Sequence, residues 1–201
     1  AVAVHPNNPD AMFHNKAQIE KLADRMRRKD GRLIIDEAFC DTDPDKSFVP
    51  HMVRNMVILK SFGKFFGLAG VRLGFAICDR QLAARITDWF GPWAVSGPAL
   101  EIGAAALADK EWTATTRLWL AARSRALAEM LQDQGLEILG VNGLFVLAYH
   151  ERAAGLCESL QRSRILARPF PDRDGLVRFG LCAEDAQLRR LRSAIQQFLR
   201  R

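Results

Sequence analysis

The residues best suited to chemistry in this chain lie in one glycine-rich stretch, where a single lysine stands among phenylalanines. Residues 61–75 read SFGKFFGLAGVRLGF, and Lys64 is the one lysine in them. Because an unpaired ammonium group is costly to bury, either the side chain reaches water or its amine is needed in a desolvated place. A desolvated amine loses its proton more readily and can act as a nucleophile. The phenylalanines on both sides favour the second interpretation, so we expect Lys64 to lie in a dry pocket.

Other chemistry-bearing residues follow short apolar runs that read as strands. Asn8 follows AVAV, Asp36 ends RLIID, and Ser61 ends NMVILKS, three residues before Lys64. Runs of this kind, without clean polar alternation, are typical of strands buried on both faces. Because ligands of open α/β sheets bind at the carboxyl ends of the strands, we expect these residues and Arg72 to share one edge of a sheet.

Helical segments must connect and position these strands. The apolar spacing in residues 14–29, with Gly31 as a stop, predicts an amphipathic helix. An Asn142–Gly143 pair between two apolar runs predicts a β-hairpin. The other expected elements are a strand within 71–79, helical segments over 80–109 with a break at 91–98, a helix over 111–134, a helix over 151–163, strands over 164–168 and 176–181, and a helix over 184–199.

This order of elements predicts three parts of the chain. We expect an α/β layered domain over residues 1–110, a connecting helix over 111–134 and a small α+β domain over 135–201. The composition is that of a globular protein, with 49% hydrophobic and 26% charged residues. The formal net charge is +6, but most of the arginines fall on expected helix faces, and no aromatic ladder or DNA-binding motif accompanies them. Solvated helix faces are therefore the favoured interpretation, and no nucleic-acid partner is expected.

The cysteines and the apolar runs suggest a location for the protein. Cys40, Cys78, Cys157 and Cys182 lack the close spacing of zinc or redox motifs, so we expect no metal site and read them as small buried hydrophobes of a reducing compartment. The sequence contains no signal peptide and no apolar run long enough to span a bilayer. We therefore expect a cytoplasmic protein without a membrane partner.

The ordered set N-P-D, D-E-A-F, S-x-x-K and then R resembles the fold-type I pyridoxal phosphate enzymes, the aspartate aminotransferase superfamily. The resemblance covers essentially the whole chain, but it begins partway into the family's sequence, so the family's N-terminal portion lies outside these 201 residues. The implied fold is the C-terminal part of the large domain, a central sheet with flanking helices, followed by the small α+β domain. The resemblance also implies pyridoxal 5′-phosphate as cofactor and a homodimer as the assembly.

The same resemblance assigns a role to each residue at the expected sheet edge. Lys64 matches the lysine that forms the Schiff base with the cofactor, and Asp36 matches the carboxylate that keeps the ring nitrogen protonated. Asn8 matches the residue that hydrogen-bonds the 3′ oxygen of the ring. Ser61 and Arg72 match ligands of the cofactor phosphate, to which an arginine offers two donors in a planar fork.

Further residues are assigned by resemblance around the substrate and the asparagine turn. Arg178 in LVRFGL matches the arginine that binds the α-carboxylate of the substrate. Arg168, ten residues earlier, stands near where relatives with phosphorylated substrates carry a cation for the substrate phosphate, although the spacing is shorter than expected. Pro9 matches a position where the family can hold a cis peptide bond, which would aim the side chain of Asn8.

Three residues depart from the family pattern. Phe39 stands where a tyrosine usually donates a hydrogen bond to the 3′ oxygen of the ring, so that oxygen loses a donor here. Ala11 stands where the turn normally has glycine, which makes the turn less permissive. His5 precedes Pro6 where asparagine is common.

Within the family, DEAF together with SFGKFFGLAGVRLGF looks most like the branch that decarboxylates L-threonine O-3-phosphate to (R)-1-amino-2-propanol O-2-phosphate in cobalamin biosynthesis. A histidinol-phosphate-type aminotransferase is the alternative within the family, and either enzyme takes a small phosphorylated amino compound. An alternative of another class is that this chain is a folded but catalytically silent fragment, because a fold alone does not guarantee activity.

Overall fold

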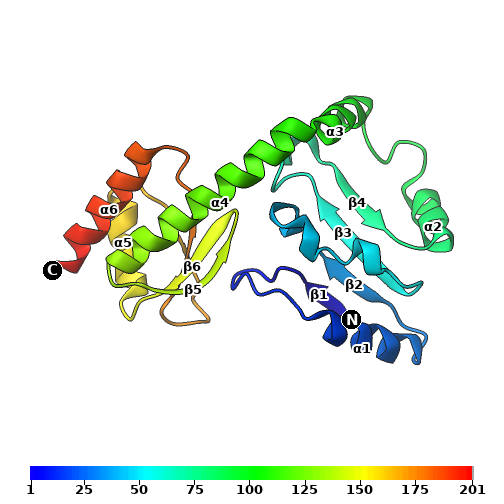
Figure 1. Cartoon of the computed structure of the whole chain (residues 1–201), viewed down its shortest axis with the longest axis horizontal. Coiled ribbons are helices and arrows are strands. Elements are labelled where there is room, and N and C mark those ends of the chain that lie inside the picture. The colour runs from blue at the N-terminus through cyan, green and yellow to red at the C-terminus, as the bar shows by residue number, and fades with distance from the viewer. Residues whose placement is uncertain (201) are drawn as a thin grey trace. The chain divides into compact units, whose positions relative to one another are not determined.

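The structure is a computed structural model, and it describes residues 1–200 of the chain. Contacts within the chain divide it into two compact units. The first contains Ala1–Asn8 and Met12–Thr115, and the second contains Pro9–Ala11 and the chain from Thr116 onward. Each unit has its own sheet and its own core, so each is described separately (Figure 1).

The first unit is built on a four-stranded sheet of order β1-β2-β3-β4. The strands are β1 (Val2–Val4), β2 (Leu33–Asp36), β3 (Met56–Ser61) and β4 (Gly74–Ile77). The first three are parallel, and β4 runs antiparallel to β3. All four expected strands are therefore confirmed, and the parallel pairs bring the carboxyl ends of three strands to one edge of the sheet.

Helix α1 (Lys16–Arg27) packs against the sheet and begins at a defined cap. The Asn15 side chain accepts a hydrogen bond from the backbone N–H of Ala17 at 2.8 Å. The Gln18 side-chain oxygen accepts one from the backbone N–H of Asn15 at 3.3 Å, which completes a capping box. The helix contributes Ile19 and Ala23 to a buried cluster that also contains Leu33, Ile35, Phe48, Met56 and Ile58. Burial of this apolar face fixes the helix on the sheet, as the sequence spacing predicted.

The chain after β4 forms α2 (Arg80–Phe90), α3 (Gly97–Ala108) and α4 (Lys110–Asp133), with the expected break between α2 and α3. Asp79 and Ser96 cap α2 and α3 by accepting hydrogen bonds from backbone N–H groups. In the first turn of α4, Trp112 lies against Phe65 and Phe66, with ring centroids 5.6 and 5.8 Å apart. None of the helices within residues 1–200 combines the length and apolarity that crossing a membrane requires.

The second unit has a four-stranded sheet of order β5-β6-β8-β7 with all pairs antiparallel. Its elements beyond α4 are β5 (Glu137–Asn142), β6 (Phe145–Tyr149), α5 (Ala153–Arg162), β7 (Arg168–Pro169), β8 (Leu176–Gly180) and α6 (Asp185–Leu199). The core joins the last turns of α4 to the sheet and to helices α5 and α6, through residues such as Leu131, Leu156 and Ile195, which have no exposed surface. The predicted hairpin and the predicted helices are confirmed.

The strand expected over residues 164–168 is wrong, because the observed strand β7 contains only Arg168 and Pro169. Arg164 adopts a left-handed conformation with φ of 56°, and the N–H of Ile165 bonds the carbonyl of Leu160 at 2.9 Å. The left-handed residue and this bond close the C-terminus of α5, so the backbone is not extended at residue 164. Pro169 and Pro171 then lack the N–H groups that a longer strand would need.

The cysteine prediction is confirmed only in part. All four cysteines are free, but only Cys40 is buried, and the other three are half-buried. Burial, reinforced by the nearby Glu37 carboxylate, raises the pKa of the Cys40 thiol to about 12. This thiol is therefore inert at neutral pH.

Candidate active site

The carboxyl ends of β1, β2 and β3 form the edge where the sequence placed its candidate residues. In the sheet register Val4 lies opposite Asp36, and Asp36 lies opposite Leu59 of β3. Beyond this point the backbone of His5 donates to the Asp36 carbonyl at 2.8 Å, and the backbone of Glu37 donates to the Leu59 carbonyl at 2.9 Å. The three chain segments therefore leave the sheet together.

Asp36 is half-buried at the last position of β2. Its Oδ1 accepts a hydrogen bond from the backbone N–H of Ala38 at 2.9 Å, which fixes the direction of the carboxylate. This turn also places Phe39 three residues later, close to the lysine that follows β3. A fixed carboxylate at a strand end can hold a positively charged or protonated nitrogen of a ligand.

Lys64 lies in a tight turn after β3. The Ser61 hydroxyl accepts a hydrogen bond from the backbone N–H of Gly63 at 3.3 Å, and Gly67 donates to the Lys64 carbonyl at 3.1 Å. A Cβ atom at Gly63 would lie 3.0 Å from the Cα of Ala69, so only glycine fits this close approach without a shift. The Lys64 ammonium lies 5.5 Å from the centroid of the Phe39 ring.

The expectation of a desolvated Lys64 is wrong for this chain, because the structure places the residue in an exposed position. The flanking phenylalanines do not enclose the amine. Phe62 and Phe65 are 1% and 4% exposed, and Phe65 and Phe66 pack against Trp112. Their hydrophobic side chains anchor the turn from below, and the lysine between them is left to point outward.

Arg72 approaches the same turn from the other side. Strand pairing places Ser61 opposite Gly74, and the backbone of Phe62 donates to the carbonyl of Leu73 at 3.2 Å. Arg72 therefore lies just beyond the end of β3, in a left-handed conformation with φ of 59°, after the short 3₁₀ turn η4 (Ala69–Val71). Its Nη1 donates to the Ala69 carbonyl at 3.2 Å, and the residue is exposed. A hydroxyl and a guanidinium at one turn form a suitable pair of donors for a phosphate group.

A buried ion network that was not predicted from the sequence lies directly behind this edge. Glu37 has no exposed surface, and its carboxylate accepts hydrogen bonds from the Ser47 hydroxyl and the Phe48 N–H, both at 2.6 Å. Lys60 lies 2.9 Å from Glu37 and 3.0 Å from Asp41, with 16% of its side chain exposed. The sequence signal was available, because Glu37 and Lys60 directly adjoin Asp36 and Ser61, but strand pairing was needed to connect them.

The network fixes the charge state of its members. Burial alone would lower the pKa of Lys60, but the Glu37 hydrogen bond and the Asp41 charge outweigh it, so the pKa is raised. Lys60 therefore stays protonated at neutral pH and neutralises the buried Glu37 carboxylate. Short 3₁₀ turns position the other members of the network. Asp41 lies in η1 (Cys40–Thr42), and Ser47 and Phe48 lie between η2 (Pro44–Lys46) and η3 (Val49–His51).

His5 joins the segments that leave β1 and β2. It is 1% exposed, its Nδ1 accepts from the backbone N–H of His14 at 3.1 Å, and its Nε2 lies 2.9 Å from the Lys46 carbonyl. A ring that accepts at Nδ1 and donates at Nε2 is neutral. Burial lowers the pKa of His5, which stabilises the same neutral form. The histidine thus holds two loops in place at the position where asparagine was expected.

The turn that follows β1 and contains Asn8 differs from expectation in the position of its cis peptide bond. The cis bond lies at His5–Pro6 and not before Pro9, so the predicted cis position is wrong. Asn8 is exposed at the end of the first unit's opening segment, on the side of β1 where the strand ends. Ala11 adopts a left-handed conformation with φ of 59°, the backbone region in which relatives would be expected to have glycine.

The two candidate substrate arginines lie together in the second unit. Arg168 of β7 and Arg178 of β8 are direct cross-strand partners. The Arg178 guanidinium lies 5.3 Å from the centroid of the Phe145 ring. Burial lowers the pKa of Arg178, and the charge of Arg168 acts in the same direction. Like charges directly opposite each other in a sheet are unfavourable, so this pair favours a bound anion.

Comparisons with known proteins identify the family of the chain. The family model described as aminotransferase class I and II matches residues 2–195. The chain is 40% identical over 196 residues to a threonine-phosphate decarboxylase from Sinorhizobium sp, and 37% identical over 198 residues to a threonine-phosphate decarboxylase from Pseudomonas aeruginosa. These matches cover 96% and 98% of this chain, but the chain spans only 58% and 60% of the length of the two relatives.

Among solved structures, the chain is similar to the histidinol-phosphate aminotransferase from Clostridium acetobutylicum. The two share 27% sequence identity with a TM-score of 0.88, and the match covers 98% of this chain and 64% of that one. The similarity extends through the elements of both units.

Proposed function

The chain belongs to the class I and II aminotransferase family, and from this membership we propose that it is part of a pyridoxal phosphate-dependent enzyme that decarboxylates L-threonine O-3-phosphate. The identities of 40% and 37% to two threonine-phosphate decarboxylases support this choice within the family. As the family resemblance implies, the full-length enzyme would act in cobalamin biosynthesis, in the cytoplasm and as a homodimer.

The observation that carries the proposal is the position of the Lys64 ammonium, 5.5 Å from the ring of Phe39. Phe39 belongs to the turn that begins at Asp36, so the amine and the carboxylate segment meet at one edge of the sheet. Ser61 and Arg72 stand at the same turn as Lys64. An amine, a fixed carboxylate and two phosphate donors are the set that pyridoxal phosphate requires, so the residues present fit this cofactor.

The chain's own residues divide the work of binding and proton transfer. Bound pyridoxal phosphate would supply the electron sink for breaking a bond at the substrate Cα. Lys64 would hold the cofactor covalently, Asp36 would hold a proton at its ring nitrogen, and Asn8 would donate to its 3′ oxygen. Ser61 and Arg72 would hold its phosphate. Once the substrate amine has displaced Lys64 from the cofactor, the freed amine of Lys64 would return a proton to Cα after carbon dioxide has left.

The arginine pair of the second unit would bind the substrate anions. Arg178 would hold the α-carboxylate, and Arg168, its cross-strand partner, would hold the substrate phosphate. The register supports this pairing, because it places the two guanidinium groups on adjacent strands despite the short spacing in sequence. An anion between them would also relieve the repulsion that the pair creates.

The first experiment tests whether this chain binds the cofactor. Pyridoxal phosphate is added to the protein, the visible absorbance band is recorded, and borohydride reduction is followed by peptide mass spectrometry. We expect a coloured protein that is labelled at Lys64, and no label in the Lys64→Ala variant. Lys60→Arg serves as a matched control, since it removes the lysine nearest in sequence to Lys64 but keeps a largely buried cation in β3. A colourless protein, or label spread over other lysines, would favour the silent-fragment alternative.

A second candidate is a histidinol-phosphate-type aminotransferase, which the fold similarity to the Clostridium acetobutylicum enzyme supports. The full-length chain separates the two activities. We expect release of carbon dioxide from threonine phosphate and no 2-oxoglutarate-dependent transamination of histidinol phosphate. Pure transaminase activity would overturn the decarboxylase proposal and leave the cofactor site intact.

A further inference from the structure

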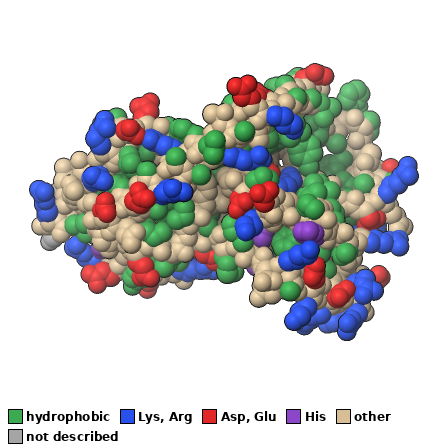
Figure 2. Space-filling view, viewed as in Figure 1, with side chains coloured by type: hydrophobic (Ala, Val, Ile, Leu, Met, Phe, Trp, Pro, Cys, Tyr) green, Lys and Arg blue, Asp and Glu red, His purple; other side chains and the backbone are tan. Residues whose placement is uncertain are grey.

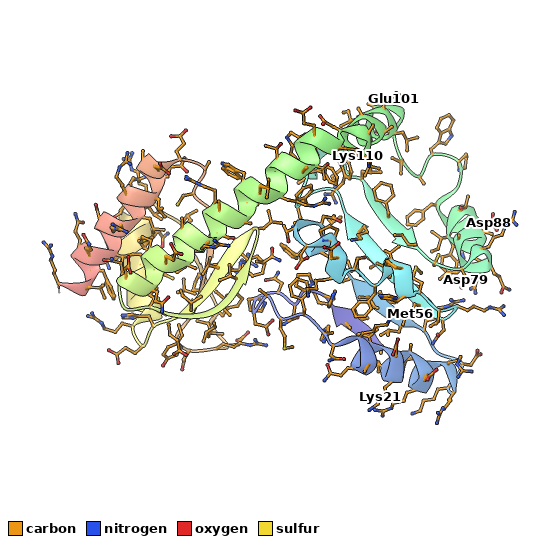
Figure 3. All side chains as sticks on the ribbon, viewed as in Figure 1. Lys21, Met56, Asp79, Asp88, Glu101 and Lys110 are labelled. Atoms are coloured by element: carbon orange, nitrogen blue, oxygen red, sulfur yellow. The ribbon has the colours of Figure 1, made fainter. Side chains whose placement is uncertain are left out.

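A basic cavity of the first unit lies at the amino ends of β2 and β3, opposite the edge that carries Asp36 and Lys64. It has a volume of about 680 Å³ and is lined by Arg27, Asp30, Gly31, Arg32, Arg54, Asn55, Gln81 and Arg85. Figure 3 labels Met56 and Asp79, which mark the start of β3 and the residue before α2 at this end of the sheet. The volume lies in the range of pockets that bind small molecules.

The four arginines of this pocket are unequally compensated. Arg32 lies 2.7 Å from Asp79, and Arg27 lies 3.2 Å from Asp24. Arg54 and Arg85 have no carboxylate within ion-pair distance among residues 1–200. The Arg54 guanidinium donates to the Gln81 side-chain oxygen at 3.5 Å, and that of Arg85 lies over the Trp89 ring. Lys and Arg side chains gather over α1 at the lower right of Figure 2. The walls of the pocket thus present two guanidinium groups that have no carboxylate at ion-pair distance, from different segments of the chain, together with one carboxylate, that of Asp30.

Asn55, one of the residues that line the pocket, has a buried polar atom without a hydrogen-bond partner among the described residues. The Nδ2 group of Asn55 donates to the carbonyls of Ala23 at 2.8 Å and Gly31 at 3.4 Å, which fixes the orientation of the amide. Its Oδ1 is buried and has no hydrogen-bond partner among the described residues. A buried acceptor without a donor costs free energy. The atom has almost no accessible surface, so a hydroxyl or amino group of a ligand can satisfy it only when the Asn55 side chain shifts toward the pocket.

We propose that this arginine-lined pocket binds a small diphosphate ester whose organic part carries a hydroxyl or amino donor. Two guanidinium forks from different segments of the chain match two adjacent anionic groups better than a single carboxylate, because each fork can bind one phosphate through two parallel bonds. The donor of the organic part satisfies Asn55. The site lies at the other end of the strands from the candidate active site, so it does not depend on the proposed function.

Isothermal titration calorimetry with ADP, pyrophosphate and adenosine tests the proposal. We expect one ADP per chain, weaker binding of pyrophosphate because it lacks the organic donor, and no binding of adenosine. The double variant Arg54→Gln/Arg85→Gln should weaken ADP binding by about tenfold or more, since charge-assisted bidentate bonds are lost. The variant Arg54→Lys/Arg85→Lys keeps the charge but loses the planar guanidinium groups. Its affinity for ADP should lie between those of the wild type and the Gln double variant.

Two controls exclude other origins of the signal. Arg125→Gln/Arg189→Gln removes the same charge from exposed helix faces of the second unit, and it should leave ADP binding within about twofold of the wild type, because distant exposed charges are screened. Arg72→Gln should also leave it unchanged. Loss of binding in either control, equal binding in the Arg54/Arg85 double variant, or no ADP binding at all would overturn the proposal. So would a change in the oligomeric state of the double variant without ligand, which would assign the arginines to a protein partner.

Discussion

The two ends of the strands β2 and β3 carry charge in opposite ways. At the carboxyl ends the buried carboxylate of Glu37 is satisfied by Lys60, Ser47 and Phe48, so the network is closed. At the amino ends Arg54 and Arg85 line a cavity without a carboxylate partner among the described residues. At the carboxyl ends the buried charges of Glu37 and Lys60 neutralise each other beneath the candidate active site. At the amino ends the guanidinium groups of Arg54 and Arg85 border a cavity and have no ion-pair partner among the described residues.

This difference separates positioning from binding. A closed network in a low-dielectric interior is rigid, because each member loses free energy when a partner moves. It can therefore hold the turns from which Lys64 and Arg72 emerge. Unpaired cations at a cavity make no such contribution to the fold, but they attract anions. Substitutions at Lys60 and at Arg54 test the two sides of this contrast.

The largest effect is expected at Lys60. Lys60→Met should lower the free energy of unfolding by about 3–5 kcal/mol, because it leaves the Glu37 carboxylate buried without its cation. Urea unfolding of the variant and the wild type measures the difference. The double variant Glu37→Gln/Lys60→Met should be more stable than Lys60→Met alone, since the unpaired charge is then removed as well. Equal losses in the single and double variants would contradict a closed ion network.

A smaller effect is expected from acid at His5. Burial lowers the pKa of His5 in the folded state, so as the pH falls the unfolded chain takes up the proton first. The stabilisation is complete above the unfolded value of about 6.5 and is lost as the pH falls from there toward the lowered folded pKa. The charges that face the ring are Glu37, which opposes the shift, and His14 and Lys60, which reinforce it.

Urea unfolding at about pH 7.5 and about pH 5.5 measures this loss, which we expect to be on the order of 1 kcal/mol. In His5→Asn the difference between the two pH values should shrink, because the buried titrating ring is gone. His51→Asn, which alters an exposed histidine, should keep the full difference. An unchanged pH dependence in His5→Asn would show that other groups cause it.

The sequence predicted the helices, the strands of the first unit and the residues at the sheet edge because each rests on a local signal. Apolar runs predicted β1 to β4, and the spacing of residues 14–29 predicted α1. The Glu37–Lys60 contact could not be found in this way, because it depends on the pairing of β2 with β3. The burial of Lys64 was predicted wrongly, since neighbouring phenylalanines can pack beneath a turn as well as around a side chain. The opposition of Arg168 and Arg178 likewise required the register of two strands.

At Phe39 we expect a spectroscopic change with little effect on stability. Phe39→Tyr adds a hydroxyl to the ring beside Lys64 and should alter the free energy of unfolding by less than about 0.5 kcal/mol. If pyridoxal phosphate is bound, the new donor would stabilise its anionic 3′ oxygen. The pH midpoint of the visible band should then fall by about one unit. Phe39→Leu, which adds no donor, should not lower the midpoint, and a Tyr variant with an unchanged midpoint would place the 3′ oxygen elsewhere.

The smallest effect is expected at the amino ends, where the absence of a compensating network should make single arginines dispensable to the fold. Arg54→Gln should leave the free energy of unfolding within about 0.5 kcal/mol of the wild type. Any gain in stability should vanish in high salt, because it comes only from relief of repulsion between exposed cations, which salt screens. Urea unfolding at low and high salt measures both quantities. Since Arg54 lies just before strand β3 and Lys60 lies near its carboxyl end, the two variants compare the ends of the strand directly. A loss at Arg54→Gln as large as that at Lys60→Met would mean that the amino end is also held by a closed network, and the contrast between positioning and binding would fail.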